Sequence, residues 1–327
     1  MADQLVSRHI AAEGGSRLAS APQTLLLLAL LGCLAAGFSF GSPYFLSTGN
    51  LINIMLSMSV IGVMAAVSTL ILIGRGLDLS LGSVVALVGL VTATALEHGF
   101  HWAPAAAMGI ATGAACGLFN GLLIVYLGIN SIIVTIGTLS IYRGIAYAVS
   151  EGKSLFVSDE AILTFGAGRI GFIPVAVILM LFVFAVCHIA ATHTRVGRTL
   201  YAVGANPRAS RLSGISIRSY RLWIFVISGM SAAVAGILLI GQAATAVPAA
   251  GIGYELLVVT AVLLGGASLH GGEGRISGTL LGVLIIGVLN NGMTLLGVNS
   301  YFQTIAHGAL LLLAVTIDQV RRGINLD

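Results

Sequence analysis

A basic segment between two apolar stretches, residues 193–221, has the clearest pattern of residues with a chemical use. Asn206 is a favourable helix N-cap, Pro207 suits the first helical position and Gly214 suits a helix end, so the spacing predicts a short helix over 207–213. So short a helix is marginally stable alone and would gain from binding in a groove of another protein. Two interpretations are equally well supported by the caps and the periodicity alone: a helix that docks on another protein, and a basic anchor that only sets membrane topology. The segment contains no acidic residue and six arginines, at positions 195, 198, 208, 211, 218 and 221.

Asp78 is the most unusual acidic residue, because it lies between apolar residues in a glycine-flanked stretch that also contains Gly76, Ser80 and Gly82. An ionised carboxylate in such surroundings needs a partner. Arg75 could supply it, or Asp78 could accept hydrogen bonds from backbone N–H groups where the chain enters a helix at Ser80. We expect this stretch to hold a broken helix in position rather than to contact a substrate.

Uncharged polar residues on apolar stretches are candidates for a substrate path. Such groups offer weak, replaceable hydrogen bonds that suit a neutral, hydroxylated solute. Three of them share one helical face by their spacing of four and three residues. Hydrogen bonding between helices explains any single one equally well. The candidates are Asn50, Asn53, Ser131, Thr135, Thr138, Asn290, Asn291, Thr294 and Gln303.

Several chemical activities have no matching motif. There is no phosphate-binding loop, and the only lysine is Lys153, so ATP binding of the P-loop type is excluded. The chain also lacks a zinc-protease motif, a serine nucleophile elbow and a pair of carboxylates within an apolar stretch. We therefore expect no catalytic residue and no metal ligand, and any ATP hydrolysis would need another polypeptide.

The composition shows what must position these residues. Of 327 residues, 57% are hydrophobic and only 8% are charged, against about a quarter in soluble domains. The molecular surface must therefore face lipid, and arginines that cluster between apolar stretches argue against nucleic acid. We predict an all-α membrane protein of about ten transmembrane helices. Two of the apolar stretches, 83–97 and 255–269, are short and glycine-flanked, which is typical of broken or re-entrant helices. The ten stretches are 24–40, 51–73, 83–97, 104–127, 131–149, 171–191, 222–243, 255–269, 276–297 and 302–319.

The distribution of basic residues predicts the orientation. Placing residues 193–221 in the cytoplasm puts twelve basic residues inside and only Lys153 and Arg169 outside, as the positive-inside rule requires. Arg143 lies within a span, and we expect it to snorkel to the interface. Both termini are then cytoplasmic. The predicted organisation is a segment 1–23, a transmembrane domain 24–319 with a cytoplasmic loop 193–221, and a tail 320–327.

Seven stretches, taken together in their order and spacing, resemble the permease subunit of ribose-type bacterial ABC importers from about residue 43 to residue 318. At 75–78 that family usually has Gly-Gly-Ile-Asp, whereas this chain keeps the aspartate but has an arginine first. The stretches are 76–82, 194–198, 201–215, 253–256, 264–269, 278–280, and 289–293 with 296–298.

The resemblance implies a non-catalytic translocation subunit of the bacterial inner membrane. It would move a ribose-like pentose, a hexose or a related polyol by alternating access. The implied partners are a cytoplasmic ATPase, which binds ATP and magnesium, a periplasmic sugar-binding protein and a second permease copy, identical or similar. The family's coupling helix maps onto 206–214, so the implied coupling residues are Arg195, Arg198, Asn206, Pro207, Arg208, Arg211 and Gly214.

Two functions of other classes are alternatives. An ion-coupled secondary transporter of a small neutral solute would need ionisable residues within its spans, and none is evident. A membrane scaffold without transport would leave the polar intramembrane residues and the basic, capped loop without a purpose.

Overall fold

The structure is a computed structural model, and it describes residues 23–321. The predicted segment 1–23 and tail 320–327 therefore lie largely outside the described residues. Within that part of the chain the architecture is helical, and eight helices are long and apolar enough to cross a membrane. They are α2 (Gln23–Gly41), α3 (Thr48–Ile73), α5 (Trp102–Tyr126), α6 (Ser131–Ser150), α8 (Val175–His193), α11 (Ile217–Ala243), α13 (Ile276–Leu295) and α14 (Ser300–Arg321).

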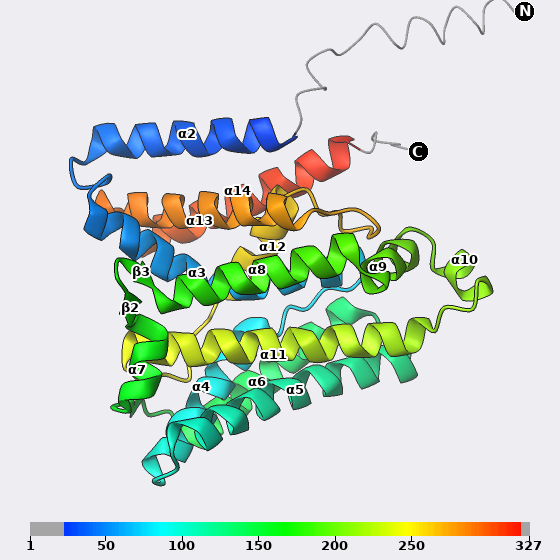
Figure 1. Ribbon diagram of the computed structural model, residues 1–327, viewed down its shortest axis with the longest axis horizontal. Helices are drawn as coiled ribbons and strands as arrows, with labels where there is room; N and C mark the ends of the chain where they lie inside the picture. The colour runs from blue at the N-terminus through cyan, green and yellow to red at the C-terminus, as the bar shows by residue number, and fades with distance from the viewer. Residues whose placement is uncertain (1–22, 322–327) are drawn as a thin grey trace, which may run out of the picture.

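These helices run side by side, with α3 and α11 inside the bundle and α2 and α14 at one edge (Figure 1). In their most apolar windows, 78% of the α3 residues and 72% of the α11 residues are buried, against 6% in α2 and in α14. A bundle helix in water would confine its apolar residues to the core. The apolar outer faces of α2 and α14 fit the expected environment of lipid.

Two shorter apolar helices, α4 (Leu81–Glu97) and α12 (Tyr254–Leu264), follow stretches of non-helical chain. At a rise of about 1.5 Å per residue, α12 reaches only about 16 Å, roughly half of a hydrocarbon core. Residues 74–80 precede α4, and residues 244–253 precede α12. Each of the two short, glycine-flanked stretches of the sequence thus forms a short helix preceded by non-helical chain, and we call these segments the first and second broken helices.

The starts of the two broken helices touch each other. A Cβ atom on Gly82 would collide with the carbonyl oxygen of Gly251 and with the carboxylate of Glu255. Gly251 also has a φ of 69°, in the left-handed region that favours glycine. The two non-helical stretches can meet within the bundle because neither glycine has a side chain.

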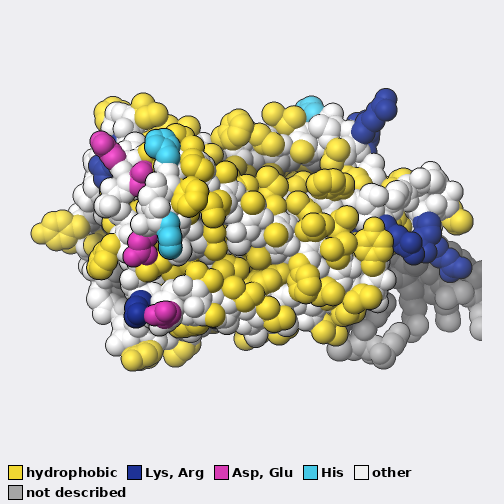
Figure 2. All heavy atoms as spheres, turned by 90° about the horizontal axis from the view of Figure 1, so that it is seen from below, with side chains coloured by type: hydrophobic (Ala, Val, Ile, Leu, Met, Phe, Trp, Pro, Cys, Tyr) yellow, Lys and Arg dark blue, Asp and Glu magenta, His cyan; other side chains and the backbone are white. Residues whose placement is uncertain are grey.

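One end of the bundle carries two helices outside the membrane-crossing set, α9 (Arg195–Ala205) and α10 (Pro207–Leu212). Basic side chains gather at this end, whereas acidic side chains lie mainly at the other (Figure 2). Helix α2 begins and α14 ends at the basic end (Figure 1). The positive-inside rule predicts that this is the cytoplasmic end.

The opposite end carries small elements that the hydropathy pattern did not predict. Helix α7 (Glu160–Ala167) begins after Asp159, whose side chain caps it. Two antiparallel pairs of very short strands lie near it: β1 (Leu155–Phe156) pairs with β4 (Thr245–Ala246), and β2 (Arg169–Ile170) pairs with β3 (Ile173–Pro174). The β1–β4 pair ties this region to the chain that follows α11.

Candidate functional site

Helix α10 forms where the sequence predicts a short capped helix. The Asn206 side-chain oxygen accepts a 3.0 Å hydrogen bond from the Ala209 backbone N–H, and Pro207 occupies the first turn. The helix ends at Leu212, one residue before the predicted end, and Gly214 follows with a φ of 81°. Local capping chemistry therefore fixes both ends of α10.

Helix α10 projects from the bundle with little to cover it (Figure 1). Leu212 is 86% exposed, and Ser210 on the opposite face is buried. Basic side chains and one large apolar side chain on an isolated helix form a surface suited to another protein's groove. Of the residues predicted to couple to an ATPase, Pro207 is half-buried and the others are exposed: Arg195, Arg198, Asn206, Arg208, Arg211 and Gly214.

Helix α9 joins α10 to the membrane part. A Cβ atom on Gly204 would collide with the Ile73 carbonyl oxygen and the Gly272 backbone, so α9 lies directly against both. The Gly272 backbone N–H donates to the same Ile73 oxygen at 2.8 Å. The Tyr201 hydroxyl donates to the Gly274 oxygen at 2.7 Å, and burial raises the pKa of Tyr201, so the phenol stays neutral. A movement of α10 would thus reach the chain after α3 and the chain after α12.

Asp78 is 4% exposed and is fully hydrogen-bonded. One carboxylate oxygen accepts from the Ser80 backbone N–H at 3.0 Å and from the Ser80 hydroxyl at 2.6 Å, and the other accepts from the Ser228 hydroxyl at 2.6 Å. The Asn120 amide donates to the Ser80 hydroxyl oxygen at 2.9 Å, and the Tyr142 hydroxyl donates to the Asn120 oxygen at 3.0 Å. The network joins the start of α4 to α5, α6 and α11.

Of the two partners that the sequence allowed for Asp78, the structure selects the groups at Ser80. Arg75 is exposed and donates instead to the Ala205 carbonyl oxygen at 3.3 Å. Sequence reasoning missed Ser228, Asn120 and Tyr142. They lie 22 to 150 residues from their hydrogen-bond partners, and no local spacing relates them to Asp78.

The prediction for Arg143 is wrong. Its guanidinium does not snorkel to the interface but donates 2.6 Å hydrogen bonds to the carbonyl oxygens of Pro248 and Ala250. These carbonyls belong to the non-helical stretch before α12, where the backbone needs donors from elsewhere in the protein. Glu255 also supports this stretch, because one of its carboxylate oxygens accepts from the Gly253 N–H at 3.2 Å. Arg143 thus holds the second broken helix as Asp78 holds the first.

The predicted substrate-path residues on α6 face the first broken helix. The Ser131 hydroxyl oxygen accepts from the Leu77 backbone N–H at 3.3 Å. The Thr135 hydroxyl lies 3.4 Å from the Leu77 carbonyl oxygen and donates to the Ser131 oxygen at 2.8 Å. The Thr138 hydroxyl contacts the Thr135 oxygen at 3.4 Å. Their shared face is confirmed, and in this conformation it binds protein backbone.

The remaining predicted path residues lie toward the outer end of the bundle, opposite α9 and α10. Asn50 and Asn291 exchange two hydrogen bonds of 2.8 Å that join α3 to α13. Gln303 donates to Thr294 at 3.4 Å, and Asn53 is exposed. Asn290 contacts His307. The structure thus separates the nine candidates into an inner and an outer group.

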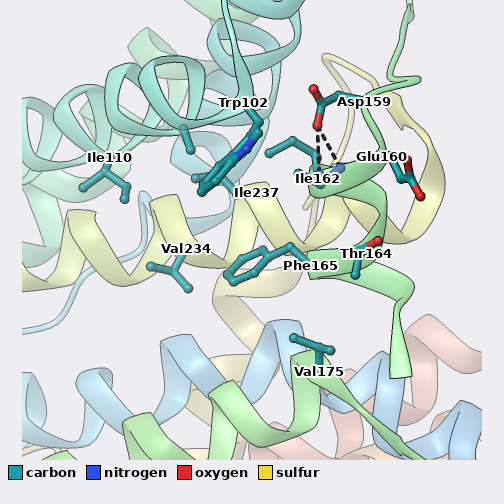
Figure 3. Close-up of a pocket in the computed structure, with 12 residues that line it drawn as sticks. Trp102, Ile110, Asp159, Glu160, Ile162, Thr164, Phe165, Val175, Val234 and Ile237 are labelled. Atoms are coloured by element: carbon teal, nitrogen blue, oxygen red, sulfur yellow. Dashed lines mark hydrogen bonds between the residues drawn. The ribbon is translucent and has the colours of Figure 1, made fainter. Parts of the chain in front are cut away.

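An apolar cavity at the outer end does not suit a sugar. It has a volume of about 780 Å³ and lies between α5, α7, α8 and α11 (Figure 3). Trp102, Ile110, Phe165 and Ile237 point into it from these elements. The Asp159 carboxylate at its rim is already engaged as the cap of α7, accepting from two backbone N–H groups at 3.0 and 3.1 Å.

Known proteins resemble this chain over most of its length. Residues 50–315 match the family described as branched-chain amino acid transport system / permease component. The ribose import permease protein RbsC of Escherichia coli K12 is 39% identical over 300 residues, which cover 90% of this chain and 93% of that protein. The D-allose transport system permease protein AlsC of the same strain is 36% identical over 89% and 90%. The L-arabinose ABC transporter permease protein AraH of Azospirillum brasilense is 35% identical over 88% and 85%.

No solved structure matches the chain significantly. The family match nevertheless extends from α3 to α14 and includes both broken helices and the α9–α10 segment. Eight helices able to cross a membrane agree with a multi-pass protein of the bacterial inner membrane. The chain therefore belongs to this permease family, as a relative of the ribose-type ABC import permeases.

Proposed function

We propose that the chain is the translocation subunit of an ATP-driven importer of a monosaccharide, which is a ribose-like pentose, a hexose or a related polyol. Relatives named for ribose, allose and arabinose import support the solute class. The observation that carries the proposal is the exposed, basic, capped helix α10, which contacts the bundle through α9 at the inner ends of both broken helices.

The required partners follow from what the chain lacks. A cytoplasmic ATPase would bind ATP and magnesium and hold α10 in a groove, because this sequence has no phosphate-binding loop. A periplasmic binding protein would deliver the sugar at the opposite end, and a second permease copy would complete the path. The chain itself would catalyse no reaction.

The proposed mechanism is alternating access between two states. Closure of the ATPase pair on ATP would push α10, and α9 would transmit the movement to the chain after α3 and after α12. The two broken helices begin against each other, at Gly82 and Gly251, so their displacement would change the packing inside the bundle. ATP would bias a two-state element, as any such coupling requires.

Reconstitution in liposomes with the ATPase and the binding protein tests this proposal. We expect uptake of a labelled monosaccharide to require enclosed ATP and to persist after an ionophore dissipates ion gradients. Uptake that ignores ATP but follows an imposed ion gradient would support the secondary-transporter alternative and contradict the proposal.

A charge reversal on α10 tests the coupling role separately. Arg208 is exposed, so Arg208→Glu should leave insertion and assembly of the bundle intact. We expect it to lower sugar-stimulated ATP hydrolysis by about tenfold, because a desolvated charge at an interface would meet the wrong sign. Arg208→Lys, which keeps the positive charge at the same exposed position, is the matched control. Equal stimulation of ATP hydrolysis in both variants would show that α10 does not couple the ATPase to the bundle.

A further inference from the structure

A polar cavity of about 430 Å³ opens at the cytoplasmic end, between the turn after α3, the α5–α6 connection and the beginning of α11. Four arginines line it from three separate elements: Arg75, Arg211, Arg218 and Arg221. None of the described residues on its wall is acidic. Four positive charges therefore border one space without a carboxylate to neutralise them there.

Arg221 marks the inner part of this cavity. Its Nε atom is buried and has no hydrogen-bond partner among residues 23–321. Arg75 and Arg211 lie close enough to repel its charge. A buried charged donor without an acceptor is unfavourable, and repulsion from neighbours of like charge adds to that cost. An anion in the cavity would remove both.

The helix dipoles at the cavity do not replace such an anion. Helix α6 begins at Ser131 with a partial positive charge of about half an elementary charge, and the C-terminal end of α5, at Val125, contributes about the same with opposite sign. The Asn130 side chain is engaged with the Ile132 N–H as the α6 cap. The field in the cavity is therefore that of the four guanidinium groups.

Arg75 has an unfavourable backbone conformation for its residue type. Its φ is 61°, in the left-handed region where glycine is unstrained and arginine is not. Among the described residues its side chain makes one hydrogen bond, to the Ala205 oxygen, which has a length of 3.3 Å and does not require a positive charge. A role for the Arg75 charge at the cavity would explain an arginine at this turn.

We propose that this cavity binds the phosphate group of an anion. Guanidinium groups match phosphate oxygens with paired hydrogen bonds, and four of them exceed what a carboxylate needs. The bound phosphate would join α10, through Arg211, to the turn before the first broken helix, through Arg75. The proposal depends neither on the transported solute nor on the ATPase.

Two sources could supply this phosphate. Ile129 lines the cavity and is 38% exposed, and the adjacent Tyr126 and Leu127 are 65% and 66% exposed at the end of α5. An anionic phospholipid of the inner leaflet could lay its acyl chains along this apolar rim with its head group among the arginines. Free inorganic phosphate from the cytoplasm could enter the same space.

The lipid source is tested on the full-length chain, purified in detergent and delipidated. Native mass spectrometry measures binding of dioleoyl-phosphatidylglycerol, with zwitterionic dioleoyl-phosphatidylcholine as the comparison. We expect one phosphatidylglycerol to bind at least about tenfold more tightly than phosphatidylcholine, because the quaternary ammonium of choline would add a positive charge beside the four arginines.

The soluble source is tested by thermal unfolding of the same sample. We expect inorganic phosphate to raise the midpoint of unfolding above the value in sodium chloride of equal ionic strength if the cavity takes up free phosphate. Equal ionic strength separates specific binding from general screening.

Two variants locate the site. Arg221→Gln removes the buried donor, and Arg75→Gly removes a charge while relieving the strained φ. Unfolding midpoints in sodium chloride equal to that of the unaltered chain establish that both variants are folded. Each variant should bind the phosphate probe that the unaltered chain prefers about tenfold more weakly. Arg195→Gln, which removes an exposed charge on α9 outside the cavity, should bind as the unaltered chain does.

The proposal is supported if both cavity variants bind phosphatidylglycerol or inorganic phosphate more weakly and the control variant does not. The probe that shows this effect identifies the source of the phosphate. The proposal is overturned if phosphatidylglycerol binds no better than phosphatidylcholine and phosphate protects no better than chloride. It is also overturned if Arg75→Gly and Arg221→Gln bind both probes as tightly as the control variant does.

Discussion

The Ser228 hydroxyl on α11 donates a 2.6 Å hydrogen bond to the Asp78 carboxylate in the non-helical stretch before α4. These residues are 150 positions apart, and the bond holds a broken helix against the long central helix of the bundle. Both residues are buried, and Ser228 is 0% exposed. The bond therefore contributes to the position of α4 as well as to stability.

Removal of this bond should destabilise the protein measurably. We expect Ser228→Ala to lower the free energy of unfolding by about 1–3 kcal/mol, because one carboxylate oxygen of Asp78 loses its buried donor. Thermal unfolding in detergent measures the change. Ser140→Ala, at an exposed serine on α6, is the control and should have no effect beyond error. Equal midpoints for the two variants would show that the bond is unimportant.

The contact between the broken helices should not tolerate a side chain. We expect Gly82→Ala to reduce the yield of folded protein strongly, because its Cβ would overlap the Gly251 oxygen and the Glu255 carboxylate. Gly137→Ala is the matched control, since nothing lies within 4 Å of a Cβ at this position in α6. Alanine is favoured over glycine in helices by up to about 1 kcal/mol, so the control should be neutral or stabilising. Size-exclusion profiles of detergent extracts compare the two.

Loss of the Arg143 side chain should loosen the second broken helix. We expect Arg143→Met to increase hydrogen exchange at residues 244–253, because the Pro248 and Ala250 carbonyls lose their donors. Mass spectrometry of peptides from this stretch measures the exchange. Arg169→Met, at the same end but in an exposed strand, should leave it unchanged. Unaltered exchange in Arg143→Met would contradict the assigned role.

The cap of α10 should matter for coupling more than for folding. We expect Asn206→Ala to destabilise α10 by about 1 kcal/mol and to reduce sugar-stimulated ATP hydrolysis without lowering the yield of folded protein. Asn206→Ser should restore most of the stimulation, because serine also caps helices well. A serine variant as defective as the alanine variant would mean that the amide acts by some contact other than the cap.

Features that depend on local chemistry were predictable from the sequence. The cap at Asn206 and the glycine at 214 define α10, and short glycine-flanked apolar stretches indicate α4 and α12. Helix α7 was missed although its signal is of the same kind, since Asp159 is a favourable cap followed by Glu160 in the first turn. A helix of eight residues is too short for the hydropathy pattern to indicate it.

Features that depend on long-range packing were not predictable. Nothing near Asp78 in the sequence indicates Ser228, and nothing near Arg143 indicates the carbonyls of Pro248 and Ala250. A buried polar group takes whichever partner the fold places beside it, and that partner is set by helix packing. For the same reason, the nine polar path candidates could be recognised by type but not sorted into an inner and an outer group.

The central claim is that this chain moves a sugar only together with a separate ATPase. Affinity purification of the tagged chain from its native host in mild detergent, with ATP hydrolysis measured on the eluate, tests it most directly. We expect a co-eluting subunit with a phosphate-binding loop, whose ATP hydrolysis rises on addition of a sugar-loaded binding protein. A protein that elutes without any ATPase and still moves solute down an ion gradient in vesicles would contradict it.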